Sequence, residues 1–221
     1  MNARNASKTL NRVRCGLLLL WASAGFATLA PALPAAETRS VVFFGDSLTA
    51  GFGLENPSAE SYPALIEQKI SAAQLSWRVV NAGLSGETTA GGLRRVDWIL
   101  RQPIDIFVLA LGANDGLRGV NPADSRNNLQ KIIDRVRAKN PRVKMIVAGL
   151  EMPPSMGTDF TQAFSAIFPA VAQKNAATLL PSLLEGVGGS AALNQADRIH
   201  PNPAGHRVIA ESVWRVLRPL L

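Results

Sequence analysis

The chain contains a serine, a histidine and an aspartate at positions that suit nucleophilic catalysis. Ser47 lies in Gly45-Asp46-Ser47-Leu48, directly after residues 41–44, a β-branched and aromatic run that predicts a buried strand. His200 lies near the far end of the chain, three residues after Asp197. An imidazole oriented by a carboxylate can deprotonate a serine hydroxyl while that hydroxyl attacks an acyl carbonyl. These residues therefore predict acyl transfer through a serine nucleophile.

Apolar runs alternate with amphipathic segments along the rest of the chain. The apolar runs predict strands at residues 41–44, 77–81, 104–111, 143–148 and 178–180. The amphipathic segments predict helices at residues 61–73, 93–100, 121–139, 160–176 and 202–217, the fourth of them kinked at Pro169. Near-continuous apolar strands that alternate with helices are typical of a parallel sheet covered on both faces. No internal repeat or linker indicates a second domain.

Three candidate residues follow predicted strands, which places them at the same edge of the sheet. Ser47, Gly83 and Asn114 lie just past the first three strands, and ligands of such sheets bind beyond the carboxyl ends of the strands. The N–H groups of Ser47 and Gly83 and the side-chain amide of Asn114 could form an oxyanion hole, a set of donors for the charged oxygen of the intermediate. Gly83 has no side chain, so a substrate oxygen could approach its N–H closely.

Each of these residues also has a structural interpretation. Ser47 could cap a helix, and Asn114 with Asp115 could form a turn at a strand end. Asp197 could cap the turn before His200 while another acid orients the imidazole. Sequence alone leaves these alternatives open.

Ser85 and His206 are weaker candidates. Ser85, in Gly83-Leu84-Ser85-Gly86, lacks the Gly-x-Ser-x-Gly spacing of a nucleophile elbow, because the second glycine comes one residue too early. His206 is expected to face solvent or to pack against Trp214. His200 and His206 could bind a metal with Asp197, but no further ligand cluster accompanies them, so we expect no metal.

Residues 1–36 have the three parts of a secretory signal peptide. Four Lys or Arg residues without an acid precede an apolar stretch, and small residues follow up to Ala36. We expect cleavage between Ala32 and Ala36, a single catalytic domain at residues 37–221, and a periplasmic or secreted protein that does not insert stably into the membrane. An uncleaved membrane anchor is the alternative.

The composition excludes some partners and chemistry. The formal net charge of the whole chain is +7, part of it comes from the signal, and the rest is scattered without a basic block or interleaved aromatic residues. We therefore expect no nucleic-acid partner. Cys15 is the only cysteine and precedes the expected cleavage, so the mature domain would have neither disulfides nor thiol chemistry.

Four sequence blocks together resemble the SGNH (GDSL) hydrolases. They are Gly45-Asp46-Ser47-Leu48, Gly83, Gly112-Ala113-Asn114-Asp115 and Asp197-Arg198-Ile199-His200-Pro201, each in order along the chain. Residues 112–119, 163–169 and 180–181 are similar to one subgroup, the exported bacterial arylesterases and the related multifunctional thioesterase/lysophospholipase enzymes. One departure is Ala113, where many relatives have glycine, and it leaves Asn114 in place.

The resemblance implies a three-layer α/β/α fold of flavodoxin-like type, with a parallel five-stranded sheet and a shallow acyl pocket without metal or cofactor. It implies that Ser47, Gly83, Asn114 and His200 are the four signature residues and that Asp197 completes the catalytic triad. The expected function is that of an exported serine esterase, which hydrolyses carboxylic aryl or acyl esters through an acyl-serine intermediate.

Other functions on this fold stay open. A lysophospholipase or acyl-thioester hydrolase is the first alternative, and a carbohydrate O-deacetylase or a non-catalytic periplasmic binding protein comes after it. The expected partner is a small acyl ester or lysophospholipid, and the expected state is a monomer. Some apolar residues on the edge loops could line an acyl groove or merely pack those loops: Leu84, Met152, Pro153 and Met156.

Overall fold

The structure is a computed structural model that describes residues 38–221, so the predicted signal peptide lies outside the described residues. Five parallel strands form one sheet in the order β2-β1-β3-β4-β5. The strands are β1 (Arg39–Gly45), β2 (Trp77–Gly83), β3 (Ile106–Ala110), β4 (Lys144–Ala148) and β5 (Thr178–Leu180). This order is that of flavodoxin-like sheets, and it confirms the predicted fold class.

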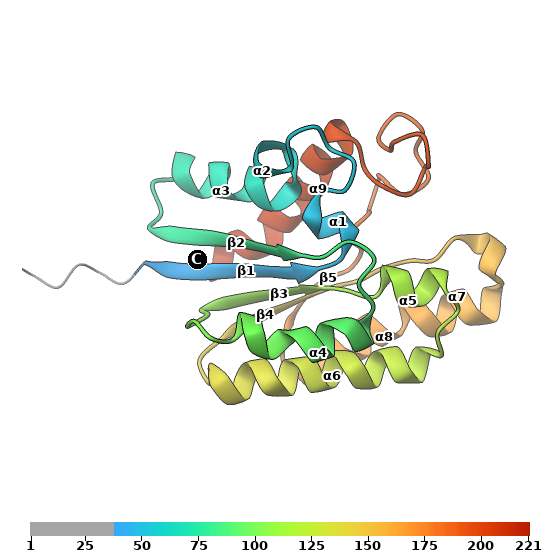
Figure 1. The fold of residues 1–221 in the computed structure, drawn as a ribbon, viewed down its shortest axis with the longest axis horizontal. Helices are drawn as coiled ribbons and strands as arrows, with labels where there is room; N and C mark the ends of the chain where they lie inside the picture. Colours follow the sequence, from blue (N-terminus) through green and yellow to red (C-terminus); the bar gives the residue numbers. More distant parts are fainter. Residues whose placement is uncertain (1–37) are drawn as a thin grey trace, which may run out of the picture. The chain divides into compact units, whose positions relative to one another are not determined.

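Helices cover both faces of the sheet, which gives three layers (Figure 1). One face is covered by α3 (Tyr62–Ala72) and α9 (Pro203–Leu217), and the other by α4 (Thr89–Ile99), α6 (Pro122–Lys139) and α8 (Ile167–Lys174). Shorter elements lie in the loops: α1 (Ser47–Ala50), α2 (Pro57–Glu60), α5 (Ala113–Leu117), η1 (Pro154–Met156), α7 (Thr158–Ser165) and η2 (Arg218–Leu220).

The central strands β1 and β3 form a rigid platform for the loops that follow them. Phe43, Phe44 and Phe107 on these strands have no exposed surface, because helices pack against both faces of the sheet. Gly45 at the end of β1 pairs with Gly83 on β2 and with Ala110 on β3. The three strands therefore end level, and the loops that follow them begin side by side.

Several boundaries differ from the prediction by a few residues, among them the start of α4 and the end of β2. The helix predicted from residue 93 begins at Thr89, because the Thr88 side chain accepts the N–H of Gly91 at 3.2 Å and caps the helix there. Gly91 and Gly92 have low helix propensity, which hid this first turn from the sequence pattern. Gly83 is the last residue of β2 and does not follow the strand.

The predicted kink at Pro169 is displaced by one helical turn. The segment forms two helices, and the break falls at Ala166, between α7 and α8. A proline cannot donate to the carbonyl four residues earlier, and its ring clashes with that carbonyl, which here belongs to Ser165. The helix is thus interrupted at the acceptor that Pro169 leaves unpaired, while Pro169 itself lies in the first turn of α8.

Candidate active site

The structure brings the serine, histidine and aspartate predicted from the sequence into one hydrogen-bonded line. Ser47 Oγ lies 2.9 Å from His200 Nε2, although the two residues are 153 positions apart. His200 Nδ1 lies 2.7 Å from Asp197 Oδ2. If Nδ1–H donates to the carboxylate, Nε2 is left with a lone pair facing the serine hydroxyl. This arrangement can remove the hydroxyl proton.

Ser47 is the first residue of α1, directly beyond the end of β1. Asp46 caps this helix, because its Oδ1 accepts the N–H of Leu48 at 3.1 Å. Capping is therefore the role of Asp46, and the Ser47 hydroxyl faces His200. The turn needs glycine at position 45, because a Cβ there would lie 2.1 Å from Thr49 Oγ1.

A short loop before α9 orients the histidine. Asp197 Oδ1 accepts the N–H groups of Ile199 at 2.9 Å and His200 at 3.0 Å, while Oδ2 faces the imidazole. Hydrogen bonds from the His200 N–H, the His200 side chain and the Ile199 N–H lower the pKa of Asp197 to about 2. The carboxylate therefore stays charged over the working range of an enzyme and can hold the imidazole in one tautomer.

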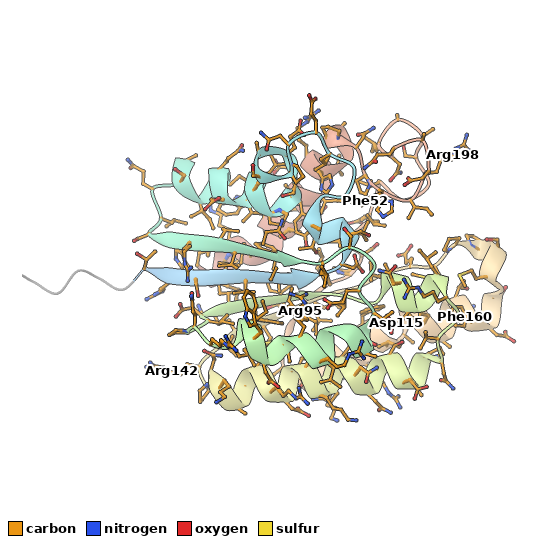
Figure 2. All side chains as sticks on the ribbon, in the orientation of Figure 1. Phe52, Arg95, Asp115, Arg142, Phe160 and Arg198 are labelled. Carbon is orange, nitrogen blue, oxygen red and sulfur yellow. The ribbon has the colours of Figure 1, made fainter. Side chains whose placement is uncertain are left out.

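Two residues that sequence reasoning missed hold this loop beside α1. Gln195 Nε2 donates to the carbonyl oxygens of Phe52 at 2.7 Å and Pro201 at 3.1 Å. The Phe52 ring packs on the imidazole of His200, with ring centroids 4.6 Å apart, and Figure 2 labels Phe52 and Arg198 at this end of the molecule. No local sequence pattern indicates these contacts, because they join loops from opposite ends of the chain.

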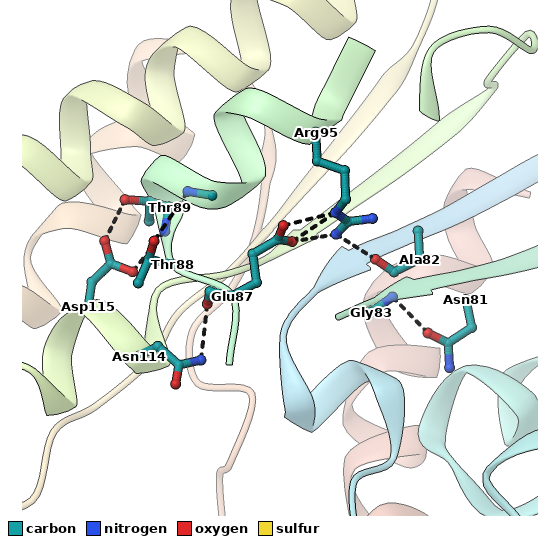
Figure 3. Close-up of polar contacts among 10 residues, drawn as sticks. Asn81, Ala82, Gly83, Glu87, Thr88, Thr89, Arg95, Asn114 and Asp115 are labelled. Atoms are coloured by element: carbon teal, nitrogen blue, oxygen red, sulfur yellow. Dashed lines mark hydrogen bonds and ion pairs between the residues drawn. The ribbon is translucent and has the colours of Figure 1, made fainter. Parts of the chain in front are cut away.

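The three predicted oxyanion donors follow three neighbouring strands. Ser47 follows β1, Gly83 ends β2, and Asn114 lies in α5 after β3. Asn114 Nδ2 donates to the carbonyl of Glu87 at 3.0 Å, which orients the amide and leaves its second N–H for another acceptor (Figure 3). The N–H of Gly83 donates to Asn81 Oδ1 at 3.0 Å, so a substrate oxygen would have to share or replace this acceptor.

The structure gives a packing reason for a glycine at position 83. A Cβ there would lie 2.3 Å from the backbone nitrogen of Ala50. The missing side chain therefore lets β2 pack against the backbone of α1, the helix that begins with Ser47. Access of a substrate oxygen to the Gly83 N–H stays a prediction.

Asp115 has a structural role beside the site. Its buried carboxylate accepts the N–H of Thr89 at 2.8 Å, the Thr89 hydroxyl at 2.5 Å and the Ser125 hydroxyl at 3.1 Å. These bonds join α5 to the first turn of α4 and to α6, so Asp115 does not simply form a turn. Within residues 38–221, no group of three or more His, Cys, Asp or Glu side chains is arranged to hold a metal ion.

The apolar residues proposed for an acyl groove divide into two kinds. Leu84 is exposed, as is Pro153, and Met156 is half-buried. Met152 is buried, and a Cβ on Gly116 would lie 2.0 Å from its sulfur. Met152 therefore packs against α5 as part of the core.

His206 is buried, so the expected solvent-facing position is wrong. Its Nδ1 accepts the N–H of Tyr62 at 3.2 Å, and its ring stacks on the Tyr62 ring with centroids 6.3 Å apart. Burial lowers the pKa of His206 to about 4. The Tyr62 hydroxyl forms a hydrogen bond of 2.7 Å with Thr49 Oγ1. His206 therefore supports α1 through Tyr62 and is not the base for Ser47.

Asp46 and His206 should affect acid stability in opposite directions. Burial raises the pKa of Asp46 to about 6, so as the pH falls the folded state takes up this proton before the unfolded state and gains stability. His206 has a lowered pKa of about 4, so the unfolded state is protonated first and stability is lost over the same range. The two effects should largely cancel between pH 6.5 and pH 4.

An Asp46→Asn variant removes one side of this balance. We expect its free energy of unfolding, relative to that of the wild type, to fall by about 2 kcal/mol between pH 7 and pH 4. Urea unfolding of both proteins at the two pH values measures this difference. Parallel pH dependence in both proteins would contradict it.

Known proteins are similar to this chain over most of its length. A model of the GDSL-like lipase/acylhydrolase family matches residues 43–208. Esterase TesA of Pseudomonas aeruginosa is 40% identical over 188 residues, which are 85% of this chain and 90% of that protein. Thioesterase 1/protease 1/lysophospholipase L1 of Escherichia coli (strain K12) is 36% identical over 188 residues, 85% of this chain and 87% of that protein.

The fold agrees with this similarity. A crystal structure of TesA superposes with a TM-score of 0.78 and 38% sequence identity, over 83% of this chain and 100% of that one. This chain thus combines the observed sheet order with hydrogen bonds from Ser47 through His200 to Asp197. Its relatives are named as an esterase and a thioesterase. The chain belongs to the GDSL-like lipase/acylhydrolase family and is an ester-hydrolysing enzyme.

Proposed function

We propose that the protein is an exported serine esterase that hydrolyses carboxylic acyl and aryl esters through an acyl-Ser47 intermediate. The observation that carries the proposal is the line of two hydrogen bonds, 2.9 Å and 2.7 Å long, from Ser47 through His200 to Asp197. A serine that attacks an ester needs a base aligned in this way. A non-catalytic binding protein would not need it.

The reaction would run in two steps. His200 Nε2 accepts the Ser47 proton as Oγ bonds to the ester carbonyl carbon, and it returns that proton to the leaving oxygen as the ester bond breaks. Water then attacks the acyl carbon with His200 again as the base. The bond from that carbon to Ser47 Oγ breaks, the acid leaves, and His200 returns the proton to Oγ. Asp197 orients the imidazole throughout. The Ser47 N–H, the Gly83 N–H and the free N–H of Asn114 would stabilise the oxyanion of both steps.

The surface around the proposed nucleophile favours an apolar acyl group. Four large apolar side chains, here called the apolar rim, are between 41% and 49% exposed: Phe52, Leu84, Leu117 and Ile199. Each lies within five residues of Ser47, Gly83, Asn114 or His200 along the chain. Exposed apolar side chains beside a reactive group are typical of a binding site for an apolar ligand.

A panel of p-nitrophenyl esters with acyl chains of two to sixteen carbons tests the substrate class. Full burial of a CH₂ group contributes about 0.8 kcal/mol, so half-burial on the apolar rim should lower KM roughly 2-fold for each added CH₂ in the short-chain range. Turnover restricted to the acetyl ester would contradict the apolar rim as the acyl site and favour a carbohydrate O-deacetylase.

Two further substrates separate the alternatives that share this fold. Lysophosphatidylcholine tests the lysophospholipase activity, and palmitoyl-CoA tests the acyl-thioester activity. The E. coli relative is named for both. A kcat/KM at least ten times higher for either substrate than for the best p-nitrophenyl ester would make that alternative the main activity.

Export is the second part of the proposal. The basic, apolar and small-residue segments of residues 1–36 support a cleaved signal and a periplasmic or secreted enzyme. In residues 38–221, no helix is long and apolar enough to span a membrane. Mass spectrometry of the protein from a periplasmic fraction should give a chain that begins between residues 33 and 37. A full-length chain in the membrane fraction would support the uncleaved anchor instead.

A further inference from the structure

Arg95, on α4, connects two sides of the proposed oxyanion hole. Its Nη2 donates to the carbonyl of Ala82 at 2.9 Å, directly before Gly83. Its Nε donates to both carboxylate oxygens of Glu87, at 2.9 Å and 3.1 Å, and Nη2 also contacts Glu87 Oε2 (Figure 3). One guanidinium therefore holds both ends of the loop from Ala82 to Glu87.

The backbone of Glu87, held by Arg95, in turn binds the side chain of Asn114. The Glu87 carbonyl accepts a hydrogen bond of 3.0 Å from Asn114 Nδ2, the amide proposed as an oxyanion donor. Once one N–H of the amide is bound to this carbonyl, the direction of the other N–H is set. A displacement of Glu87 would therefore rotate the amide away from a substrate oxygen.

The surroundings of the ion pair limit its movement. The Glu87 side chain is only 4% exposed and that of Arg95 22%. The guanidinium also stacks over the ring of Phe44 on β1, 4.4 Å from its centroid. Phe44 has no exposed surface and lies three residues before Ser47, so the pair is fixed to the strand that precedes the nucleophile.

We propose that Arg95 is a positioning residue that holds the Gly83 N–H and the Asn114 amide in place for the oxyanion, with Glu87 as its partner. This inference rests on the proposed function of Gly83 and Asn114. Arg95 itself reaches neither the nucleophile nor its base through any contact among the described residues. It acts on the geometry of the donors, and its effect should appear in kcat more than in KM.

The chemistry of the side chain explains why an arginine is needed. A guanidinium has five N–H donors in a planar fork, so it can bind a carboxylate side-on and a carbonyl at the same time. A lysine ammonium keeps the charge and could still pair with Glu87, but it cannot hold that fixed geometry toward Ala82. Arg95→Lys therefore removes the positioning and keeps the buried charge balanced.

The test uses Arg95→Lys and Glu87→Gln in steady-state hydrolysis of a p-nitrophenyl ester. Loss of one oxyanion donor costs about 10²–10³-fold in rate, and a misplaced donor should cost about 10–100-fold in kcat with KM within 3-fold of the wild type. Glu87→Gln keeps the size of the side chain and serves if the lysine variant unfolds. Thermal unfolding of each variant shows whether the protein measured is folded.

Arg135 provides a matched control. It lies on α6, donates to the carbonyl of Leu93 at 2.8 Å and pairs with Asp97 at 3.0 Å. Like Arg95 it binds one carbonyl and one carboxylate, but its two partners lie on α4. Neither partner lies in the proposed oxyanion hole. Arg135→Lys should leave kcat unchanged, which separates positioning of the donors from general support of α4.

A double-mutant cycle with Asn114→Ala distinguishes positioning from a structural role. If Arg95 acts through both oxyanion donors, Arg95→Lys should cost clearly less in kcat when Asn114 is already alanine, because only the effect through the Gly83 N–H is left. An equal loss in both backgrounds, or an unchanged kcat in the folded Arg95→Lys variant, would overturn the inference. If Asn114→Ala alone left kcat unchanged, the proposed role of Asn114 would fail first, and the role of Arg95 with it.

Discussion

Replacing Ser47 with alanine should lower kcat/KM for p-nitrophenyl esters by at least about 10⁴-fold, because the acyl-enzyme can no longer form. The Ser47 hydroxyl has one hydrogen-bond partner among the described residues, the imidazole of His200, so its removal should not disturb α1. We expect the melting temperature to stay within a few degrees of that of the wild type. Steady-state kinetics with the purified variant, together with a thermal melt, measures both.

Ser85 offers a matched control for this experiment. It is an exposed serine on the loop after β2, near the same edge of the sheet, and its sequence lacks the spacing of a nucleophile elbow. Ser85→Ala should keep wild-type kinetics. Equal rates for wild type and Ser47→Ala would exclude Ser47 as the nucleophile.

Asp197→Asn should lower kcat by about 10³–10⁴-fold while the loop keeps its shape. The amide oxygen of asparagine can still accept the N–H groups of Ile199 and His200, which now bond to Asp197 Oδ1. The amide nitrogen would then face His200 Nδ1 and donate to it. The imidazole proton would move to Nε2, and the ring could no longer accept the proton of Ser47.

The pH dependence of the wild type gives a second view of this pair. Hydrogen bonds from the loop hold the pKa of Asp197 at about 2, so its charge does not change above about pH 3. A decline of kcat/KM between pH 8 and pH 4 must therefore come from another group. Asp197→Asn should lower the whole profile without creating a new plateau at acid pH.

Glu151 serves as the control for the acid. It is exposed on the loop after β4, at the same edge of the sheet, and Asp197 is the one acid that pairs with His200 in residues 38–221. Glu151→Gln should leave kcat unchanged. If Asp197→Asn retained more than a tenth of the wild-type kcat, some other group would have to orient the imidazole.

The sequence predicted the fold class because the information for it is local and repeated. The apolar run at residues 41–44 is buried on both faces, and the helices predicted from residues 121 and 202 are α6 and α9, which Asn121 and Asn202 cap. Hydrophobic periodicity indicates which face of a helix or strand is buried, and capping residues indicate where a helix starts. The predicted positions of the helix break near Pro169 and of the start of α4 were wrong. The carbonyl that Pro169 leaves unpaired decides the first boundary, and a glycine-containing first turn decides the second.

The candidate residues themselves could also be found in the sequence. The pairing of Asp197 with His200 is contained within three residues, and parallel strands that end level require Ser47, Gly83 and Asn114 to share one edge. Residue types, their spacing and the expectation of a parallel sheet were sufficient for this. They did not require knowledge of any distance.

Tertiary structure decided the contacts between segments that are far apart in the chain. Three hydrogen bonds join positions more than a hundred residues apart: Ser47 with His200, Tyr62 with His206, and Gln195 with Phe52. The link from Arg95 to both sides of the proposed oxyanion hole depends on the packing of α4 near the end of β2. Helix placement follows from packing of the whole core, and a hydrogen bond forms only when that packing brings donor and acceptor within about 3 Å.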